Sequence, residues 1–191
     1  MSTNLLMRIT SFHASGTTTA FDGGRTEIWS TPGQGLRLQT TTSQAGKSVD
    51  IFCKGGTTYT SAPMLAESLK QSGAADITVP PALADVYVTS KTGQGCDSFY
   101  KIPEGAKLAP DHDSSVNGTK TFALTAGNGI TSGVYHVAAE GKSYLLKLDS
   151  SRGGRSSTTT YDSFGEKFAI KFPAADKTMP MSEFRSRVSG H

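Results

Sequence analysis

The sequence lacks the features that mark membrane-spanning and nucleic-acid-binding chains. None of its apolar runs is long enough to cross a bilayer. The net charge is only +3, from 19 basic and 16 acidic residues, and no basic run is interleaved with aromatic residues, which argues against a nucleic-acid partner. The opening MSTNLL has no charged start followed by an apolar core. This leaves two readings, a cytoplasmic protein or a chain that follows a removed leader.

Cysteine is scarce, which restricts metal binding and redox chemistry. The two cysteines, Cys53 and Cys96, form no CxxC motif and have no histidine at ligand spacing, so we expect no zinc site. A disulfide between them would close a loop of 43 positions and stabilise the fold by about 4 kcal/mol in the chain-entropy model. The alternative is two buried free thiols. The disulfide reading requires an oxidising compartment.

Motifs of catalysis and cofactor binding are also missing. Gly46–Ser48 and Gly141–Ser143 resemble the end of a phosphate-binding loop, but both lack the glycine five positions before the lysine. There is no Gly-x-Ser-x-Gly elbow. His112 lies between Asp111 and Asp113, yet carboxylate-rich loops are more often solvated than metal-bound. No spacing selects a Ser/His/Asp trio, so we expect neither a metal nor a cofactor, and no enzyme.

What the sequence does contain is a clear strand pattern between Gly133 and Pro173. Apolar and polar residues alternate with period two, and glycines stand at the turns, which is typical of an antiparallel meander with one buried face. The four strands predicted here are Val134–Ala138, Tyr144–Leu148, Ser157–Tyr161 and Lys167–Phe172.

The rest of the chain predicts a second meander and little helix. Further strands are expected at Ser11–Ala20, Arg25–Thr31, Leu36–Thr42, Ser48–Cys53, Thr57–Thr60 and Thr119–Ala126, and helices at Thr3–Thr10 and Ser61–Ser72. Asp85–Thr89 and Phe99–Ile102 fit either short strands or a long loop. Residues 1–173 are predicted to form a single domain, and residues 174–191 a polar tail whose end is loose although Met179, Met181 and Phe184 could dock.

Several segments resemble one family, the actinobacterial extracytoplasmic lipoproteins of the LolA-like class, which includes the LppX/LprG type. The segments that carry the resemblance are Ser11–Gly16 (SFHASG), Lys54–Tyr59 (KGGTTY) before a helix, Asn117–Lys120 (NGTK), Val134–Leu146 (VYHVAAEGKSYLL), and Tyr161–Gly165 (YDSFG) followed by Phe172-Pro173. The sequence shows no lipobox cysteine, which is a departure from the family.

The resemblance implies a strongly curved, half-open antiparallel sheet, an unclosed barrel, with one to three short helices on its concave side. Between sheet and helices such proteins hold an apolar cavity for acyl chains. A lipid or acyl-chain ligand, a cell-membrane contact through a lipid anchor outside the present sequence, and an extracytoplasmic location follow as expectations.

Strand parity and helical face select the candidate lining residues of that cavity. They are Leu65, Leu69, Phe122, Leu124, Tyr135, Tyr144, Leu146, Phe168 and Ile170. The alternative is that these side chains pack directly against one another and leave no cavity. In that case the same fold would serve as a cell-surface sensor or a module that binds a protein partner.

Overall fold

The structure is a computed structural model that describes residues 2–19, 23–42, 48–73 and 77–188. Its strands are β1 Phe12–Thr17, β2 Gly24–Thr31, β3 Gly35–Thr42, β4 Ser48–Lys54, β5 Thr57–Ser61, β6 Tyr87–Lys91, β7 Lys107–Leu108, β8 Ser114–Val116, β9 Thr119–Gly127, β10 Thr131–Ala138, β11 Leu145–Arg152, β12 Arg155–Asp162 and β13 Thr178–Pro180. Its α-helices are α1 Thr3–Ile9, α2 Ala62–Gln71 and α3 Met181–Val188, and short 3₁₀ helices are η1 Pro81–Leu83, η2 Cys96–Phe99, η3 Pro110–His112 and η4 Ala175–Lys177.

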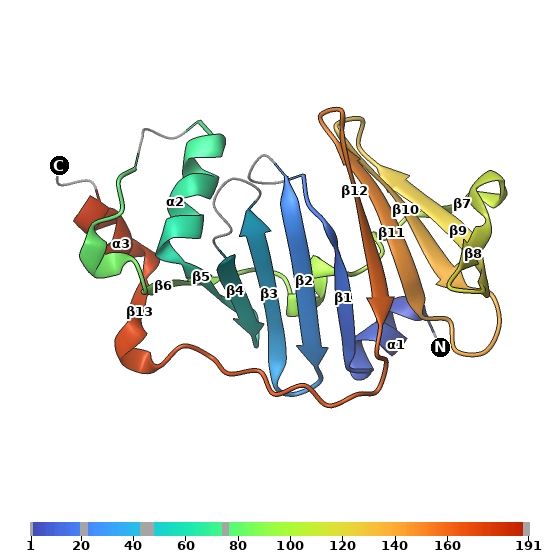
Figure 1. Ribbon diagram of the computed structural model, residues 1–191, viewed down its shortest axis with the longest axis horizontal. Helices are drawn as coiled ribbons and strands as arrows, with labels where there is room; N and C mark the ends of the chain where they lie inside the picture. The colour runs from blue at the N-terminus through green and yellow to red at the C-terminus, as the bar shows by residue number, and fades with distance from the viewer. Residues whose placement is uncertain (1, 20–22, 43–47, 74–76, 189–191) are drawn as a thin grey trace.

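All thirteen strands of the described residues belong to one sheet. Their order is β13-β6-β5-β4-β3-β2-β1-β12-β11-β10-β9-β7, and β8 pairs with β9 beside β7. Neighbours are antiparallel except for β13, which runs parallel to β6. The sheet is curved and does not close on itself (Figure 1). The predicted fold class, a mainly β, half-open antiparallel sheet with short helices, is therefore confirmed.

The two faces of the sheet follow from the register of the strands. Phe12 lies opposite Ser30, and Leu36 lies opposite Cys53. Together with Met7 of α1, Phe12, Leu36 and Cys53 belong to the buried cluster of one face, which we call the concave face. Side chains one position along each strand point to the other, convex face. Figure 1 shows the chain between β6 and β7 behind the strands, where it crosses this concave face.

One predicted strand, Lys167–Phe172, is wrong. Residues 163–174, which we call the return segment, carry no strand and run along the lower end of the sheet toward β13 (Figure 1). The hydroxyl of Thr31 donates to the carbonyl of Phe168 over 3.1 Å, and the ring of Phe172 lies 5.4 Å from that of Phe52 on the convex face. The polar and apolar residues alternate because every second side chain of this segment packs toward the sheet. The alternation therefore indicates which side chains are buried, and it does not indicate strand pairing.

The expectation of a loose end is also wrong for residues 175–188. Met179 of β13 pairs with Val88 of β6, and α3 follows directly. Phe184 is fully buried in a second cluster with Ala62, Leu83 and Val88. Among the described residues, no helix has the length and hydrophobicity to cross a membrane.

Candidate functional site on the concave face

The middle of the concave face is filled by aromatic side chains. The rings of Phe12 and Tyr100 meet edge to face at 4.9 Å, and the ring of Tyr161 lies 5.7 Å from Phe12. Met7 of α1 and Ile102 complete this part of the core. Edge-to-face pairs of buried rings stabilise a core beyond their buried area. The centre of the face is therefore closed, and any ligand must lie to one side of it.

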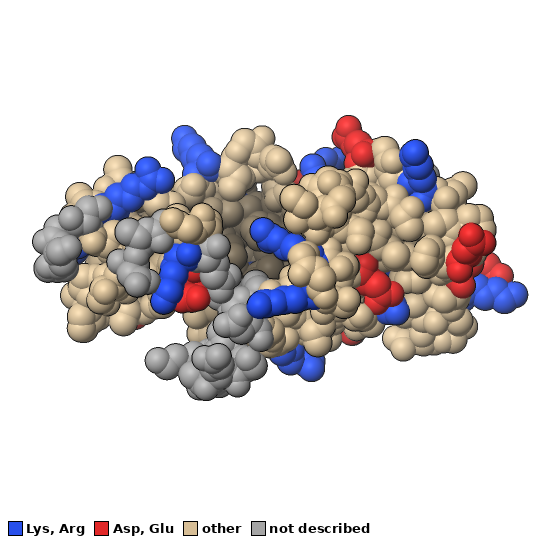
Figure 2. Space-filling view, turned by 90° about the horizontal axis from the view of Figure 1, so that it is seen from above, with Lys and Arg blue, Asp and Glu red and all other residues tan. Residues whose placement is uncertain are grey.

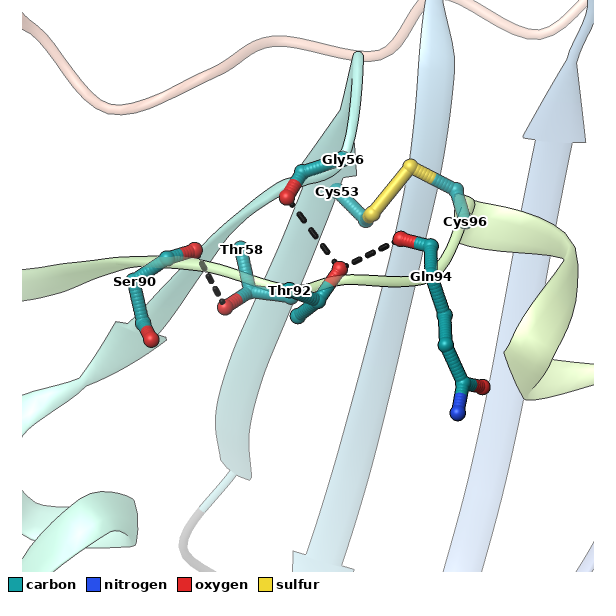
Figure 3. Close-up of a disulfide and its surroundings, with 7 residues drawn as sticks. All are labelled: Cys53, Gly56, Thr58, Ser90, Thr92, Gln94 and Cys96. Carbon is teal, nitrogen blue, oxygen red and sulfur yellow. Dashed lines mark hydrogen bonds between the residues drawn. A yellow bond between two sulfur atoms is a disulfide. The ribbon is translucent and has the colours of Figure 1, made fainter.

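Tyr100 and Ile102 belong to residues 92–106, which we call the strap. Its first anchor is the disulfide between Cys53 of β4 and Cys96 of η2, so the predicted pairing is confirmed (Figure 3). Next to it, the backbone N–H of Thr92 donates to the carbonyl of Gly56 over 2.8 Å, and the Thr92 hydroxyl reaches the same oxygen. The strap is thus fixed to the sheet at its entrance.

A second anchor joins the strap to α1. The side-chain amide of Asn4 donates to the carbonyl of Ile102 over 2.8 Å, and its oxygen accepts the Ile102 N–H over 2.8 Å. This pair satisfies both backbone groups of Ile102 in a buried place, where an unpaired amide would be costly. The strap therefore covers the concave face as a fixed element, bound to both the sheet and the first helix.

The tyrosines of this face remain uncharged near neutral pH. Burial raises the pKa of Tyr100 to about 12, and it raises the pKa of Tyr161 still further. The pKa of Tyr135 is also raised, because its hydroxyl is partly removed from water. Desolvation disfavours the phenolate in each case. Tyr100 and Tyr161 are therefore neutral residues of the core, and Tyr135 beside them is neutral as well.

A cavity of about 490 Å³ lies beside this aromatic core. Tyr135 of β10 and Leu148 of β11 face each other across the register and form its apolar wall, and Pro103–Gly105 of the strap lies against it. Ligand pockets typically measure 300–1,000 Å³ and combine apolar walls with a few polar groups. The polar groups at the rim are the side chains of Asn128, Thr131, Ser132 and Ser150 and the carboxylate of Glu104.

The concave face is also open on the other side of the core. Figure 2, seen from above the view of Figure 1, shows a hollow near the middle of the molecule, over the region of β3 and β4. Leu38 of β3 lies opposite Ile51 of β4, and both side chains are only half-buried. The face is thus wider than its own side chains and the strap fill.

The structure places four of the predicted lining residues around the concave core. Phe122, Leu124, Tyr135 and Tyr144 are partly buried against it, and of these Tyr135 lines the 490 Å³ cavity. The Tyr144 ring stacks on Phe164 with centroids 4.1 Å apart.

Leu146 belongs to neither buried cluster as described, whereas its neighbour Leu145 is fully buried. The cause is a register shift between His136 and Val137, where Val137 pairs with Leu145. A bulge of this kind reverses strand parity, and a simple alternation does not predict it.

The remaining predicted residues lie elsewhere. Leu65 and Leu69 of α2 pack against the second cluster, beside Val88 and Phe184. Phe168 and Ile170 are half-buried in the return segment. The nine residues therefore do not form one site, and a lining role is best proposed for those near Tyr135.

Sequence reasoning missed two parts of the cavity. Leu148 alternates with Tyr144 along one predicted strand, so the sequence pattern places both on the same face of the sheet. Pro103–Gly105 carries no pattern that places it on the sheet. It reaches the cavity because the disulfide and Asn4 fix the strap there.

A serine, a histidine and an aspartate do meet on the convex face. The Ser114 hydroxyl lies 3.1 Å from Nδ1 of His136, and Nε2 of His136 lies 3.1 Å from Oδ2 of Asp149. However, the Lys147 ammonium lies 2.8 Å from the same Oδ2, and Thr158 donates to Oδ1 over 2.7 Å. The imidazole is 5% exposed. We interpret this as a buried polar network that holds four strands in register, because Lys147 competes for the carboxylate that would orient a catalytic base.

The acidic cluster around His112 is likewise structural. Asp113 accepts the backbone N–H of Ala123 over 2.8 Å, and His112 ends the short helix η3. Among the described residues, no group of three or more histidine, cysteine, aspartate or glutamate side chains is arranged to hold a metal ion.

Comparison with known proteins bears on the fold. No protein-family model matches the sequence, and no curated protein matches it. Among solved structures, an uncharacterized conserved protein from Thermus thermophilus is similar with a TM-score of 0.57 and 6% identity, over 93% of this chain and 94% of that chain. This similarity shows that the arrangement of strands is a fold shared with that protein, and at this identity it shows the fold alone.

The solved structures similar to the chain also include two mycobacterial proteins. LprF from Mycobacterium bovis has a TM-score of 0.47 and 9% identity, over 91% of this chain and 94% of that chain. The lipoprotein LppX from Mycobacterium tuberculosis has a TM-score of 0.47 and 11% identity, over 88% of this chain and 92% of that chain.

Proposed function

We propose that the protein is a non-enzymatic binder of a lipid or another apolar ligand, held on the concave face of the sheet. The observation that carries this proposal is the cavity of about 490 Å³ between Tyr135, Leu148 and the strap. Each methylene of an acyl chain removed from water contributes about 0.8 kcal/mol to binding. The hydroxyls and the amide at the rim suit the polar end of such a ligand, and Tyr135 and Leu148 suit its apolar part.

The disulfide supports an extracytoplasmic, cell-envelope location for this function. Disulfides persist in oxidising compartments and are rare in the cytosol. The Cys53–Cys96 bond joins the strap to β4, so the covering of the concave face depends on it. We place the protein outside the cytoplasm on this basis, either secreted or held at the membrane by an anchor beyond the present sequence.

The proposal is tested by two measurements on the purified protein. Mass spectrometry of an organic extract should identify a co-purifying lipid, and the delipidated protein should bind a fluorescent fatty acid. Leu148→Gln should weaken that binding at least tenfold, because it places an amide in the apolar wall. Leu5→Gln, on the exposed side of α1, is the matched control and should bind like the original chain.

A protein that carries no lipid and binds no fatty acid would contradict the proposal. The alternative function, a cell-surface sensor or protein-binding module of the same fold, would then be favoured if a specific partner is captured. Circular dichroism of each variant separates loss of binding from loss of fold.

A further inference from the structure

The rim of the 490 Å³ cavity carries an exposed isoleucine on a fixed turn. Ile130 is 73% exposed at the tip between β9 and β10. The Asn128 side-chain oxygen accepts the backbone N–H groups of Ile130 and Thr131 over 3.2 and 2.9 Å. The Gly153 N–H, from the neighbouring β11–β12 turn, donates to the Ile130 carbonyl over 3.2 Å. The two turns thus hold each other, and the apolar side chain is displayed by a rigid support.

Two arginines lie beside this tip, at the β11–β12 turn. Arg152 lies opposite Thr131 in the β10–β11 ladder and opposite Arg155 in the β11–β12 ladder. Both arginines are exposed. The carboxylate on this rim is Glu104, which lines the cavity. Among the described residues, Ile130 therefore lies near the exposed side chain of Arg152 and the carboxylate of Glu104.

A second pair of exposed residues lies on the short strand beside β9. Lys107 and Leu108 form β7, and Leu108 is 70% exposed. Lys107 lies opposite Thr125 of β9, and it lines a neighbouring cavity together with Gly127, next to the β9–β10 turn. Exposed apolar residues accompanied by cations are thus repeated around this end of β9.

The tip that carries Ile130 lies directly at the rim of the cavity. Asn128 and Thr131, on either side of Ile130, both line the cavity of about 490 Å³. Any surface that receives Ile130 therefore also meets the cavity rim. In Figure 1 these turns lie at the upper edge of the sheet, and Figure 2 looks down on this edge.

We propose that this rim docks on an anionic lipid bilayer, with Ile130 entering the headgroup region and Arg152 contacting lipid phosphates. Basic side chains are attracted to anionic leaflets, and an apolar residue beside them adds insertion into the interface. A bilayer accepts a narrow tip of this kind, whereas a stable protein partner needs a broad complementary area. The inference rests on the proposed function, because docking would bring the cavity to the lipid that it takes up.

The experiment is co-sedimentation of delipidated protein with vesicles of phosphatidylcholine alone or with about one third phosphatidylglycerol. Binding should require the anionic lipid and weaken as salt is raised. Ile130→Ser should reduce the partition coefficient about tenfold, since it removes the apolar side chain that would enter the bilayer. Arg152→Gln should reduce it about fivefold.

Matched controls lie at the opposite end of the molecule. Ile9→Ser and Arg8→Gln change exposed residues of α1, at the lower edge in Figure 1, and should bind vesicles like the original chain. In Ile130→Trp, the added indole should shift its emission to the blue on anionic vesicles.

Several results would overturn the docking proposal: no sedimentation with anionic vesicles, equal binding to neutral ones, or Ile9→Ser losing as much as Ile130→Ser. Capture of a protein through Ile130 without vesicle binding would also overturn it.

The fatty-acid assay in vesicle-free solution separates the two proposals. If Ile130→Ser binds fatty acid normally but not vesicles, both hold; if the original chain binds vesicles but no fatty acid, only the ligand proposal fails.

Discussion

At the scale of single residues, the convex-face network around Asp149 links stability to pH. Burial by itself would raise the pKa of Asp149, but hydrogen bonds from Lys147, Thr158 and His136 outweigh it and hold the pKa below its ordinary value. A carboxyl whose pKa is lowered by folding contributes stability above its unfolded pKa and loses it as the pH falls through the folded value.

We therefore predict that Asp149→Asn lowers the denaturant midpoint of unfolding at pH 7. The difference from the original chain should narrow as the pH falls below about 3.8, the ordinary value of the group, because both chains then lack the charge. Equilibrium unfolding at pH 7, 5 and 3 checks this. Asp111→Asn, at an exposed position of the short helix η3, is the control, and an equal effect there would contradict the assignment.

A single glycine shows how a local rule can mislead. Gly16 weakens the strand pattern of the sequence, yet it lies within β1. A Cβ at this position would lie 1.9 Å from the backbone oxygen of Thr158, on the neighbouring strand. Close approach of β12, and not a break in the strand, explains the glycine.

At the scale of elements, the strap is the part that sequence patterns define least. It contains no strand, and its one 3₁₀ helix is four residues long. It is held by the Cys53–Cys96 bond, by Thr92 on Gly56, and by Asn4 on Ile102. These contacts join residues far apart in the sequence, so that local periodicity carries no information about them.

Removing the disulfide should therefore destabilise the protein and open the concave face. For Cys53→Ser with Cys96→Ser we expect a loss of about 4 kcal/mol in the free energy of unfolding, from the entropy of the released loop. Urea titration measures this, and the original chain in reductant should match the double variant. Stability that is unchanged in both samples would mean that the other anchors alone fix the strap.

At the scale of the whole molecule, the C-terminal segment closes one end of the sheet. β13 pairs with β6, and α3 buries Phe184 in a cluster with residues of α2 and η1. The return segment carries the chain from β12 past β1–β5 to this place (Figure 1). Residues 178–188 are thus part of the fold, although most of them are polar.

We predict that Phe184→Ala lowers the free energy of unfolding by about 3–5 kcal/mol, since it leaves a cavity in a fully buried site. Arg185→Ala, an exposed neighbour on the same helix, should change stability by less than about 0.5 kcal/mol. Thermal or urea unfolding checks both. Equal small effects would show that α3 is dispensable for the fold.

The sequence by itself determined most of the strands, the helices α1 and α2, and which two cysteines could form a disulfide. Alternation such as Phe122 and Leu124, turn glycines, and the cap and stripe of α2 are local signals, because each arises from neighbouring residues that share one backbone geometry. In residues 167–172 the alternation correctly predicts which side chains are the more buried, but it wrongly predicts that the segment pairs as a strand.

Tertiary structure alone decided where the concave face is closed and where it stays open. Strand parity assigns a side chain to a face but does not say what covers that face. The Val137–Leu145 bulge, the path of the strap, and the docking of Phe184 depend on contacts between distant segments. The cavity beside Tyr135 depends on those contacts. Periodicity therefore predicts Tyr135 as a lining residue, but it cannot predict that Pro103–Gly105 of the strap lies against the cavity.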